Sequence, residues 1–122
     1  MAKVLLIEDD DIMVDLLTTL LQIEGFEVAS VREQDDTLDI IRREAPDVVL
    51  LDVHLRSQTG QDVDGFELLK RIRSDEKYGA AKVIMSSGID FQEKCQQAGA
   101  NAFILKPYMP NALIALIKQT IN

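Results

Sequence analysis

Five short apolar runs, separated by segments of helical character, constrain the fold of this chain more than any other feature. The first run, residues 4–7, is continuously apolar, which is typical of a buried strand. Further strands are predicted over residues 26–31, 47–51, 82–86 and 102–105. Strands this short and this uniformly apolar are buried on both faces, as in a parallel sheet covered by helices.

Helical segments fill the intervals between these strands. From Asp11 the apolar residues recur at helical spacing, and Gly25 provides a stop, so the first helix is predicted to end near Glu24. Asp10 and Asp11 are expected to serve as cap or turn residues, and Asp35 or Asp36 to cap the second helix before Pro46. Further helices are predicted over residues 66–74, 91–98 and 110–121, and a polar loop over residues 54–64.

The alternation of strands and helices predicts the fold class. It indicates a doubly wound α/β protein with a five-stranded parallel sheet and helices on both faces. With right-handed crossovers, the natural strand order is the flavodoxin-like 2-1-3-4-5, and ligands bind beyond the carboxyl ends of the strands. We expect residues 1–122 to form one domain.

Composition excludes several classes of function. The formal net charge of -8 disfavours direct binding to nucleic acid, and no apolar run approaches the roughly 18 residues of a membrane helix. The N-terminus lacks the pattern of a signal peptide, so we expect a cytoplasmic location. Cys95 is the only cysteine and His54 the only histidine, which leaves no zinc-like cluster.

Acids, a hydroxyl and a lysine follow the predicted strands. Glu8 and Asp9 follow the first strand and Asp52 follows the third, while Ser87 and Lys106 follow the fourth and fifth. Strands one and three are neighbours in the predicted order, so their acids face each other across a cleft. Such repulsion calls for a cation, and carboxylates, a backbone carbonyl and water suit Mg²⁺.

The same residues predict phosphoryl chemistry. The carboxylate of Asp52 can attack phosphorus to form an acyl phosphate if a metal ion and an ammonium offset the charge on the phosphoryl oxygens. Ser87 can donate a hydrogen bond to that group, and Lys106 can contact either carboxylate or phosphate.

These residues also carry a resemblance to a known family. The chain resembles a response regulator receiver domain over essentially its whole length, through motifs that occur in receiver order: Glu8-Asp9, Asp52 within Val-Val-Leu-Leu-Asp, Asp64-Gly65-Phe66-Glu67-Leu68, Ser86-Ser87-Gly88, Ala98-Gly99-Ala100 and Lys106-Pro107. The resemblance implies that Asp52 is the phosphoacceptor and also a Mg²⁺ ligand, and that Asp9 is a direct Mg²⁺ ligand. It implies that Glu8 contacts the ion through water or from outside its immediate ligands, and that the backbone carbonyl of His54 is the third protein ligand.

The resemblance also implies a switch and its partners. Ser87 would move toward the phosphoryl group and free space for the aromatic ring of Phe103, and Lys106 would precede a cis bond to Pro107. The phosphoryl donor would be a histidine kinase or phosphotransfer protein. A downstream protein partner, or a second copy in a weak dimer, would use the surface of residues 91–98, 102–105 and 110–121. The domain would not be an enzyme, although it assists its own phosphorylation and dephosphorylation.

Two departures from the family pattern stand out. The stretch from Arg56 to Val63 looks like an insertion, because the interval from Asp52 to Asp64-Gly65 is longer than the usual tight turn. The interval from Ser87 to Lys106 is shorter than usual, which implies a trimmed loop or a short fourth helix.

Two rival functions and one unassigned side chain remain open. A metal-dependent phosphatase can also use an aspartyl nucleophile, but such enzymes place a second acid two residues later, where this chain has His54. A receiver without phosphorylation, acting only as a binding scaffold, is the second rival. The side chain of His54 either lies exposed at a loop entrance or controls water access to the acyl phosphate.

Overall fold

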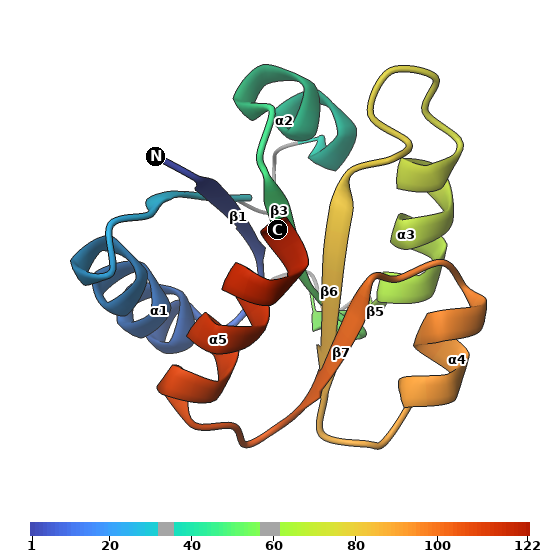
Figure 1. Ribbon diagram of the computed structural model, residues 1–122. Helices are drawn as coiled ribbons and strands as arrows, with labels where there is room; N and C mark the ends of the chain where they lie inside the picture. The colour runs from blue at the N-terminus through green and yellow to red at the C-terminus, as the bar shows by residue number, and fades with distance from the viewer. Residues whose placement is uncertain (32–35, 57–61) are drawn as a thin grey trace.

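The central sheet has five parallel strands in the order β2-β1-β3-β6-β7, which confirms the predicted order 2-1-3-4-5 (Figure 1). The computed structural model describes residues 1–31, 36–56 and 62–122. The strands of this sheet are β1 (Lys3–Ile7), β2 (Glu27–Ser30), β3 (Val48–Asp52), β6 (Lys82–Ser87) and β7 (Ala102–Leu105).

The apolar strands form because both faces of the sheet are buried. Along β1, Val4 and Leu6 pack into one hydrophobic cluster, while Leu5 and Ile7 pack into the other. Successive side chains of a strand point to opposite faces of the sheet, so a strand without polar residues packs into both hydrophobic clusters. The continuous apolar pattern follows from this arrangement.

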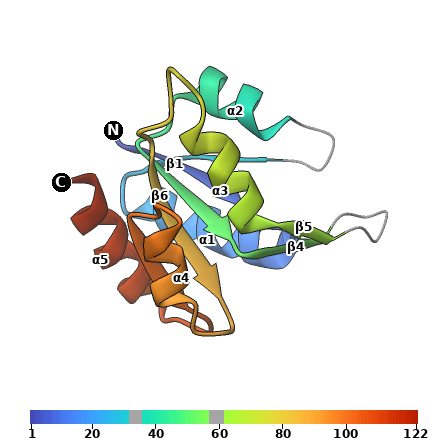
Figure 2. The same cartoon turned by 90° about the vertical axis from the view of Figure 1, so that its right-hand side faces the viewer.

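Helices cover both faces, as predicted. On one face lie α1 (Asp11–Ile23) and α5 (Pro110–Ile121), whose buried residues include Leu17 and Ile117. On the other lie α2 (Thr37–Glu44), α3 (Gly65–Arg73) and α4 (Gln92–Gln97) (Figures 1 and 2). Each face therefore has its own hydrophobic core.

The helix ends follow the predicted signals. The carboxylate of Asp10 accepts hydrogen bonds from the backbone of Ile12 and Met13, which confirms it as a cap. Asp36 caps α2, whereas Asp35 lies outside the described residues. Gly25 follows α1 with a φ of 94°, a conformation that favours glycine.

The predicted loop over residues 54–64 is wrong at both of its ends. β4 (His54–Arg56) and β5 (Asp62–Asp64) pair as an antiparallel two-stranded sheet, which projects from the carboxyl edge of the main sheet (Figure 2). In each three-residue strand, one apolar residue lies between two polar ones. This alternation has the period of two that is typical of a strand, but it is hard to recognise because most residues of the segment are polar. Residues 57–61 of the expected insertion lie outside the described ranges.

The fourth predicted helix is short. α4 has six residues, as the reduced interval before Lys106 had implied. Within residues 1–31, 36–56 and 62–122, no helix has the length and apolar character that a membrane crossing requires.

Candidate functional site

The carboxyl edge of the sheet brings the predicted polar residues together. Glu8 follows β1 directly, Asp52 is the last residue of β3, Ser87 is the last residue of β6, and Lys106 follows β7. Because β1, β3, β6 and β7 are consecutive in the sheet, their carboxyl ends meet at one edge. The sequence therefore identified these four positions correctly as neighbours.

Lys106 joins the two buried acids. Its ammonium donates hydrogen bonds to Oδ2 of Asp52 at 2.9 Å and to Oε2 of Glu8 at 3.1 Å. The side chains of both acids are only 8% exposed, against 24% for Lys106. Two carboxylates thus share one cation in a largely buried site, which we call the acid–lysine cluster: Glu8, Asp52 and Lys106.

Burial and charge shift the pKa values in this cluster. Burial, reinforced by the charge of Asp52, raises the pKa of Glu8 to about 7, although Lys106 opposes the shift. Burial acts to lower the pKa of Lys106, but its bonds to Asp52 and Glu8 outweigh that effect and raise it. Burial raises the pKa of the nearby Tyr108 to about 12. The ammonium of Lys106 therefore does not keep the pKa of Glu8 in its usual range.

Asp9 completes a group of three carboxylates. One oxygen each from Glu8, Asp9 and Asp52 lies within 4.8 Å of the other two. The donor set contains only oxygen atoms, which suits a hard cation such as Mg²⁺ and not a thiolate-preferring metal. The residues therefore fit the metal that the family resemblance implies.

Ser87 and Phe103 lie on the same face of the sheet. Ser87 pairs with Leu105, and Met85, two residues earlier, pairs with Phe103. The hydroxyl of Ser87 is buried and accepts a hydrogen bond from the backbone of Ile89 at 3.1 Å, and it can still donate its own hydrogen. Phe103 is half-buried against the core, so the two residues are placed for the predicted switch, which stays a prediction.

The peptide bond from Lys106 to Pro107 is cis, as the resemblance implied. In addition, the backbone N–H of Lys106 donates to the carbonyl of Ser87 at 2.8 Å. The lysine is therefore tied through its backbone to the strand that ends in Ser87.

Gly65 allows the chain to pass close to the end of β3. Its N–H donates to the carbonyl of Val53 at 2.7 Å, and a Cβ added at this position would come within 2.3 Å of the Asp52 carbonyl oxygen. Only glycine fits so close an approach of two backbones. The motif containing Gly65 was noted in the sequence, but this steric reason is visible only in the structure.

One contact of the site could not be predicted from the sequence. The backbone N–H of Arg56 donates to Oδ2 of Asp9 at 2.5 Å, which joins β4 to the acid group across 47 positions. Every residue except proline has such an N–H, so the residue type does not reveal this contact. Only the alternation of polar and apolar residues in β4 and β5 could have predicted the strand that carries the N–H.

His54 is exposed and its ring lies 6.2 Å from that of Phe91, edge to face. The predicted role of its carbonyl stays a prediction.

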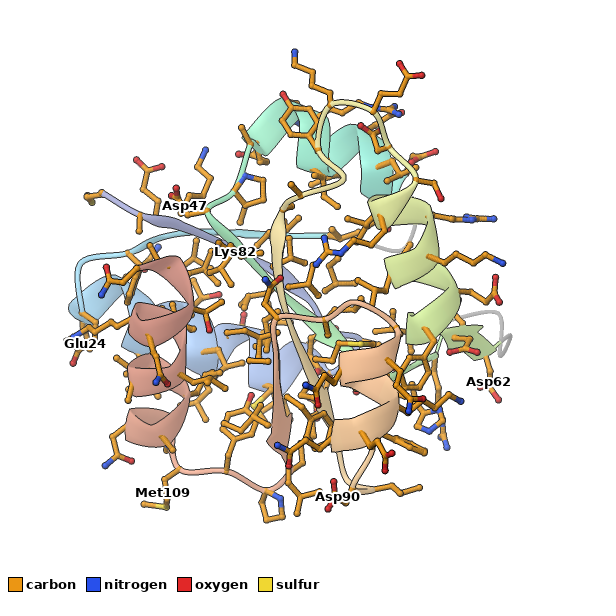
Figure 3. All side chains as sticks on the ribbon, turned by 45° about the vertical axis from the view of Figure 1, so that its right-hand side comes forward. Glu24, Asp47, Asp62, Lys82, Asp90 and Met109 are labelled. Atoms are coloured by element: carbon orange, nitrogen blue, oxygen red, sulfur yellow. The ribbon has the colours of Figure 1, made fainter. Side chains whose placement is uncertain are left out.

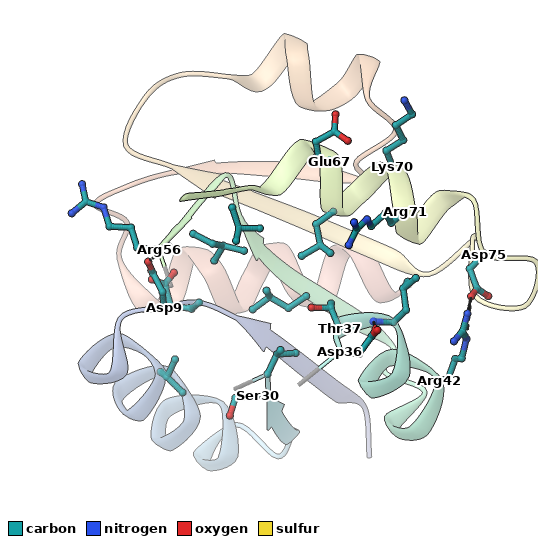
Figure 4. Close-up of a pocket in the computed structure, with 18 of the residues that line it drawn as sticks. Asp9, Ser30, Asp36, Thr37, Arg42, Arg56, Glu67, Lys70, Arg71 and Asp75 are labelled. Atoms are coloured by element: carbon teal, nitrogen blue, oxygen red, sulfur yellow. Dashed lines mark hydrogen bonds and ion pairs between the residues drawn. The ribbon is translucent and has the colours of Figure 1, made fainter. Parts of the chain in front are cut away.

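A groove of about 1290 Å³ runs beside the acid–lysine cluster (Figure 4). Asp9 and Arg56 lie at one end, and the ion pair of Arg42 with Asp75 lies at the other (Figure 4). Asp52 is not among its described lining residues. The acid–lysine cluster therefore lies at the edge of the groove, to whose lining it contributes Glu8.

Fold and site together define a doubly wound α/β protein with acids and a lysine at the carboxyl ends of its strands. Comparison with known families matches residues 4–118 to the response regulator receiver domain. The chain belongs to this family of two-component signalling domains.

Similar proteins support that assignment. The chain is 32% identical over 121 residues to the regulatory protein VanRc of Enterococcus gallinarum, covering 98% of this chain and 50% of that protein. It is 29% identical to the polar-differentiation response regulator DivK of Brucella ovis, covering 96% of this chain and 94% of DivK. The structure of chemotaxis protein CheY4 of Vibrio cholerae, at 25% identity, matches with a TM-score of 0.83 over 98% of both chains. The chain spans about half the length of VanRc and similar regulators, but nearly all of DivK.

Proposed function

We propose that this domain accepts a phosphoryl group on Asp52 in a Mg²⁺-dependent step and thereby switches the binding of a protein partner. One observation carries the proposal: Lys106 bonds to both buried acids beside the exposed Asp9. This arrangement leaves negative charge in excess where a cation and a phosphoryl group would both be held.

Each residue of the site has a role in the transfer. A carboxylate oxygen of Asp52 attacks phosphorus, the bond from phosphorus to the donor breaks, and the donor atom leaves with the electron pair. Lys106 moves its ammonium toward the developing charge on the phosphoryl oxygens, and Ser87 donates its hydroxyl hydrogen to one of them. Bound Mg²⁺ would neutralise charge on the phosphoryl group.

Asp9 and Asp52 would bind the cation directly, and Glu8 would act through water, as the family resemblance implies. The carbonyl of His54 would be a further ligand. In a strand, residues 54 and 56 have the same orientation, so this carbonyl faces the same side as the N–H that Arg56 donates to Asp9. That orientation supports the role that the family resemblance implies.

The proposed phosphoryl donor is a histidine kinase or phosphotransfer protein. We also propose that residues 1–122 form one domain and that this domain lies in the cytoplasm. Apolar side chains near the carboxyl edge offer a docking surface, since Ile12 is 81% and Met109 69% exposed. On the far side, Leu105 of β7 is 48% exposed between α4 and α5. This second surface would take the downstream partner, or a second copy in a weak dimer.

The experiment is intact mass spectrometry after incubation with acetyl phosphate and Mg²⁺. We expect one labile phosphoryl adduct, lost in Asp52→Asn and without Mg²⁺. Asp47→Asn is the matched control, because Asp47 lies exposed at the opposite end of the same strand (Figure 3). Failure to form both the adduct and a beryllofluoride complex would favour the scaffold, whereas continuous phosphate release from unrelated monoesters would favour the phosphatase.

A further inference from the structure

Among the residues that the structure describes, one backbone hydrogen bond joins the hairpin of β4 and β5 to the acid group. Arg56 donates its N–H to Oδ2 of Asp9 at 2.5 Å, and Figure 4 shows the two residues side by side. Asp9 is the exposed member of the three acids, whereas Glu8 and Asp52 are held by Lys106. The hairpin therefore reaches the one acid that the lysine does not hold.

This bond fixes an otherwise mobile carboxylate. An exposed aspartate can rotate about its side-chain torsions, and a short charge-assisted hydrogen bond restricts that rotation. The bond occupies one oxygen of Asp9 and leaves the other to face a cation. Carboxylates that bind metals are themselves commonly hydrogen-bonded, and loss of such a partner typically weakens metal binding by about 10- to 100-fold.

The N–H of Arg56 can bond to Asp9 without the loss of a hydrogen bond between β4 and β5. Arg56 is paired with Asp62, and in an antiparallel ladder residues alternate between bonding across the pair and pointing away from it. Because the N–H of Arg56 is directed at Asp9, it points away from β5. The base of the hairpin is closed by the bond from Gly65 to Val53, so the donor is carried on an anchored arm.

We propose that the β4–β5 hairpin positions Asp9 for Mg²⁺ through the backbone N–H of Arg56. Arg56 is then a positioning residue whose side chain is dispensable for this role. Coupling between two sites is reciprocal, so bound Mg²⁺ stabilises the hairpin as much as the hairpin favours Mg²⁺. This inference rests on the proposed function, because it assumes that the three acids bind Mg²⁺.

Isothermal titration calorimetry with Mg²⁺ tests the inference on four variants of the full chain. Arg56→Pro removes the N–H, while Arg56→Ala removes the same charge and keeps the N–H. Asp62→Pro and Asp62→Ala form the control pair on the opposite strand (Figure 3), where no bond to Asp9 exists. We expect Arg56→Pro to bind Mg²⁺ at least about tenfold more weakly than Arg56→Ala, and the Asp62 pair to differ by less than about threefold.

Three results would overturn the inference in distinguishable ways. If the unaltered protein does not bind Mg²⁺, the proposed function fails first. If it binds but the two Arg56 variants bind equally, the N–H has no positioning role. If both proline variants lose the same affinity, intact hairpin structure matters and the specific donor does not.

Amide hydrogen exchange of the unaltered protein provides the reciprocal measurement. Saturating Mg²⁺ is expected to slow exchange at Arg56 and its β4–β5 neighbours by at least about tenfold, in line with the tenfold change in affinity. Exchange at these amides that is unchanged in a protein shown to bind Mg²⁺ would contradict the coupling.

Discussion

The acid–lysine cluster and the β4–β5 hairpin adjoin the same edge of the sheet but are built in opposite ways. The cluster joins largely buried side chains at the carboxyl ends of β1, β3 and β7, and its hydrogen bonds span 98 and 54 positions of the chain. The strands of the hairpin, the part of it that the structure describes, are largely exposed and contact the site through one backbone N–H. The comparison indicates that strand ends bring two acids and the lysine together, while an exposed arm contacts Asp9, the proposed metal ligand.

The largest expected effect is on the rate of phosphorylation, when a residue of the acid–lysine cluster is replaced. Lys106→Met should slow adduct formation from acetyl phosphate by at least about 100-fold, the loss typical of removing a preorganised donor to developing negative charge. The rate is followed by intact mass. Lys82→Met, at the exposed amino end of β6, is the control and should react like the unaltered protein. Equal rates for the two variants would remove Lys106 from the mechanism.

The pH dependence of stability should reveal the burial of Glu8. Its pKa is raised from about 4.5 to about 7, so the folded state holds a proton that the unfolded state has lost between these values. In Mg²⁺-free buffer, this group should lower the free energy of unfolding by about 3 kcal/mol as the pH rises through that window.

Urea unfolding of Glu8→Gln supplies the reference for that prediction. The variant should match the unaltered protein at pH 4, below the unfolded pKa, and be more stable than it at pH 8 by about 3 kcal/mol. A constant difference across the pH range would show that Glu8 does not titrate between these limits.

Gly65 lies between the two regions, the acid–lysine cluster and the β4–β5 hairpin. Gly65→Ala should lower the free energy of unfolding by about 1–3 kcal/mol, because the new Cβ would meet the backbone of Asp52 and Val53. Gly88→Ala is the matched control, since a Cβ there has no atom within 4 Å and its stability should change by less than about 0.5 kcal/mol. Similar losses for both would point to a general cost of replacing glycine.

The smallest effect on the free energy of unfolding is expected for a substitution in the β4–β5 hairpin. Val63 is 42% exposed in β5, so Val63→Ser should change the free energy of unfolding by less than about 0.5 kcal/mol in the same urea assay. A loss of 2 kcal/mol or more, the size expected of a core substitution, would show that the hairpin belongs to the folded core and is not a separate arm.

The positions of Glu8, Asp52, Ser87 and Lys106 could be predicted because each ends or directly follows an apolar strand. The strand pattern places them at one edge of the sheet, whatever their side chains are. The hairpin could not be predicted with the same rule. Its two strands are three residues long, and only Leu55 and Val63 interrupt their polar composition.

By itself, the sequence determined the order of the strands, the two cores and the edge at which the acids and the lysine meet. These features follow from local periodicity and from the geometry of parallel strands. The tertiary structure alone decided that Lys106 bonds both Glu8 and Asp52, that Gly65 passes against the Asp52 backbone, and that β4 donates to Asp9. Such contacts depend on distances between segments far apart in the chain, and a backbone N–H leaves no mark in the sequence that could reveal its partner.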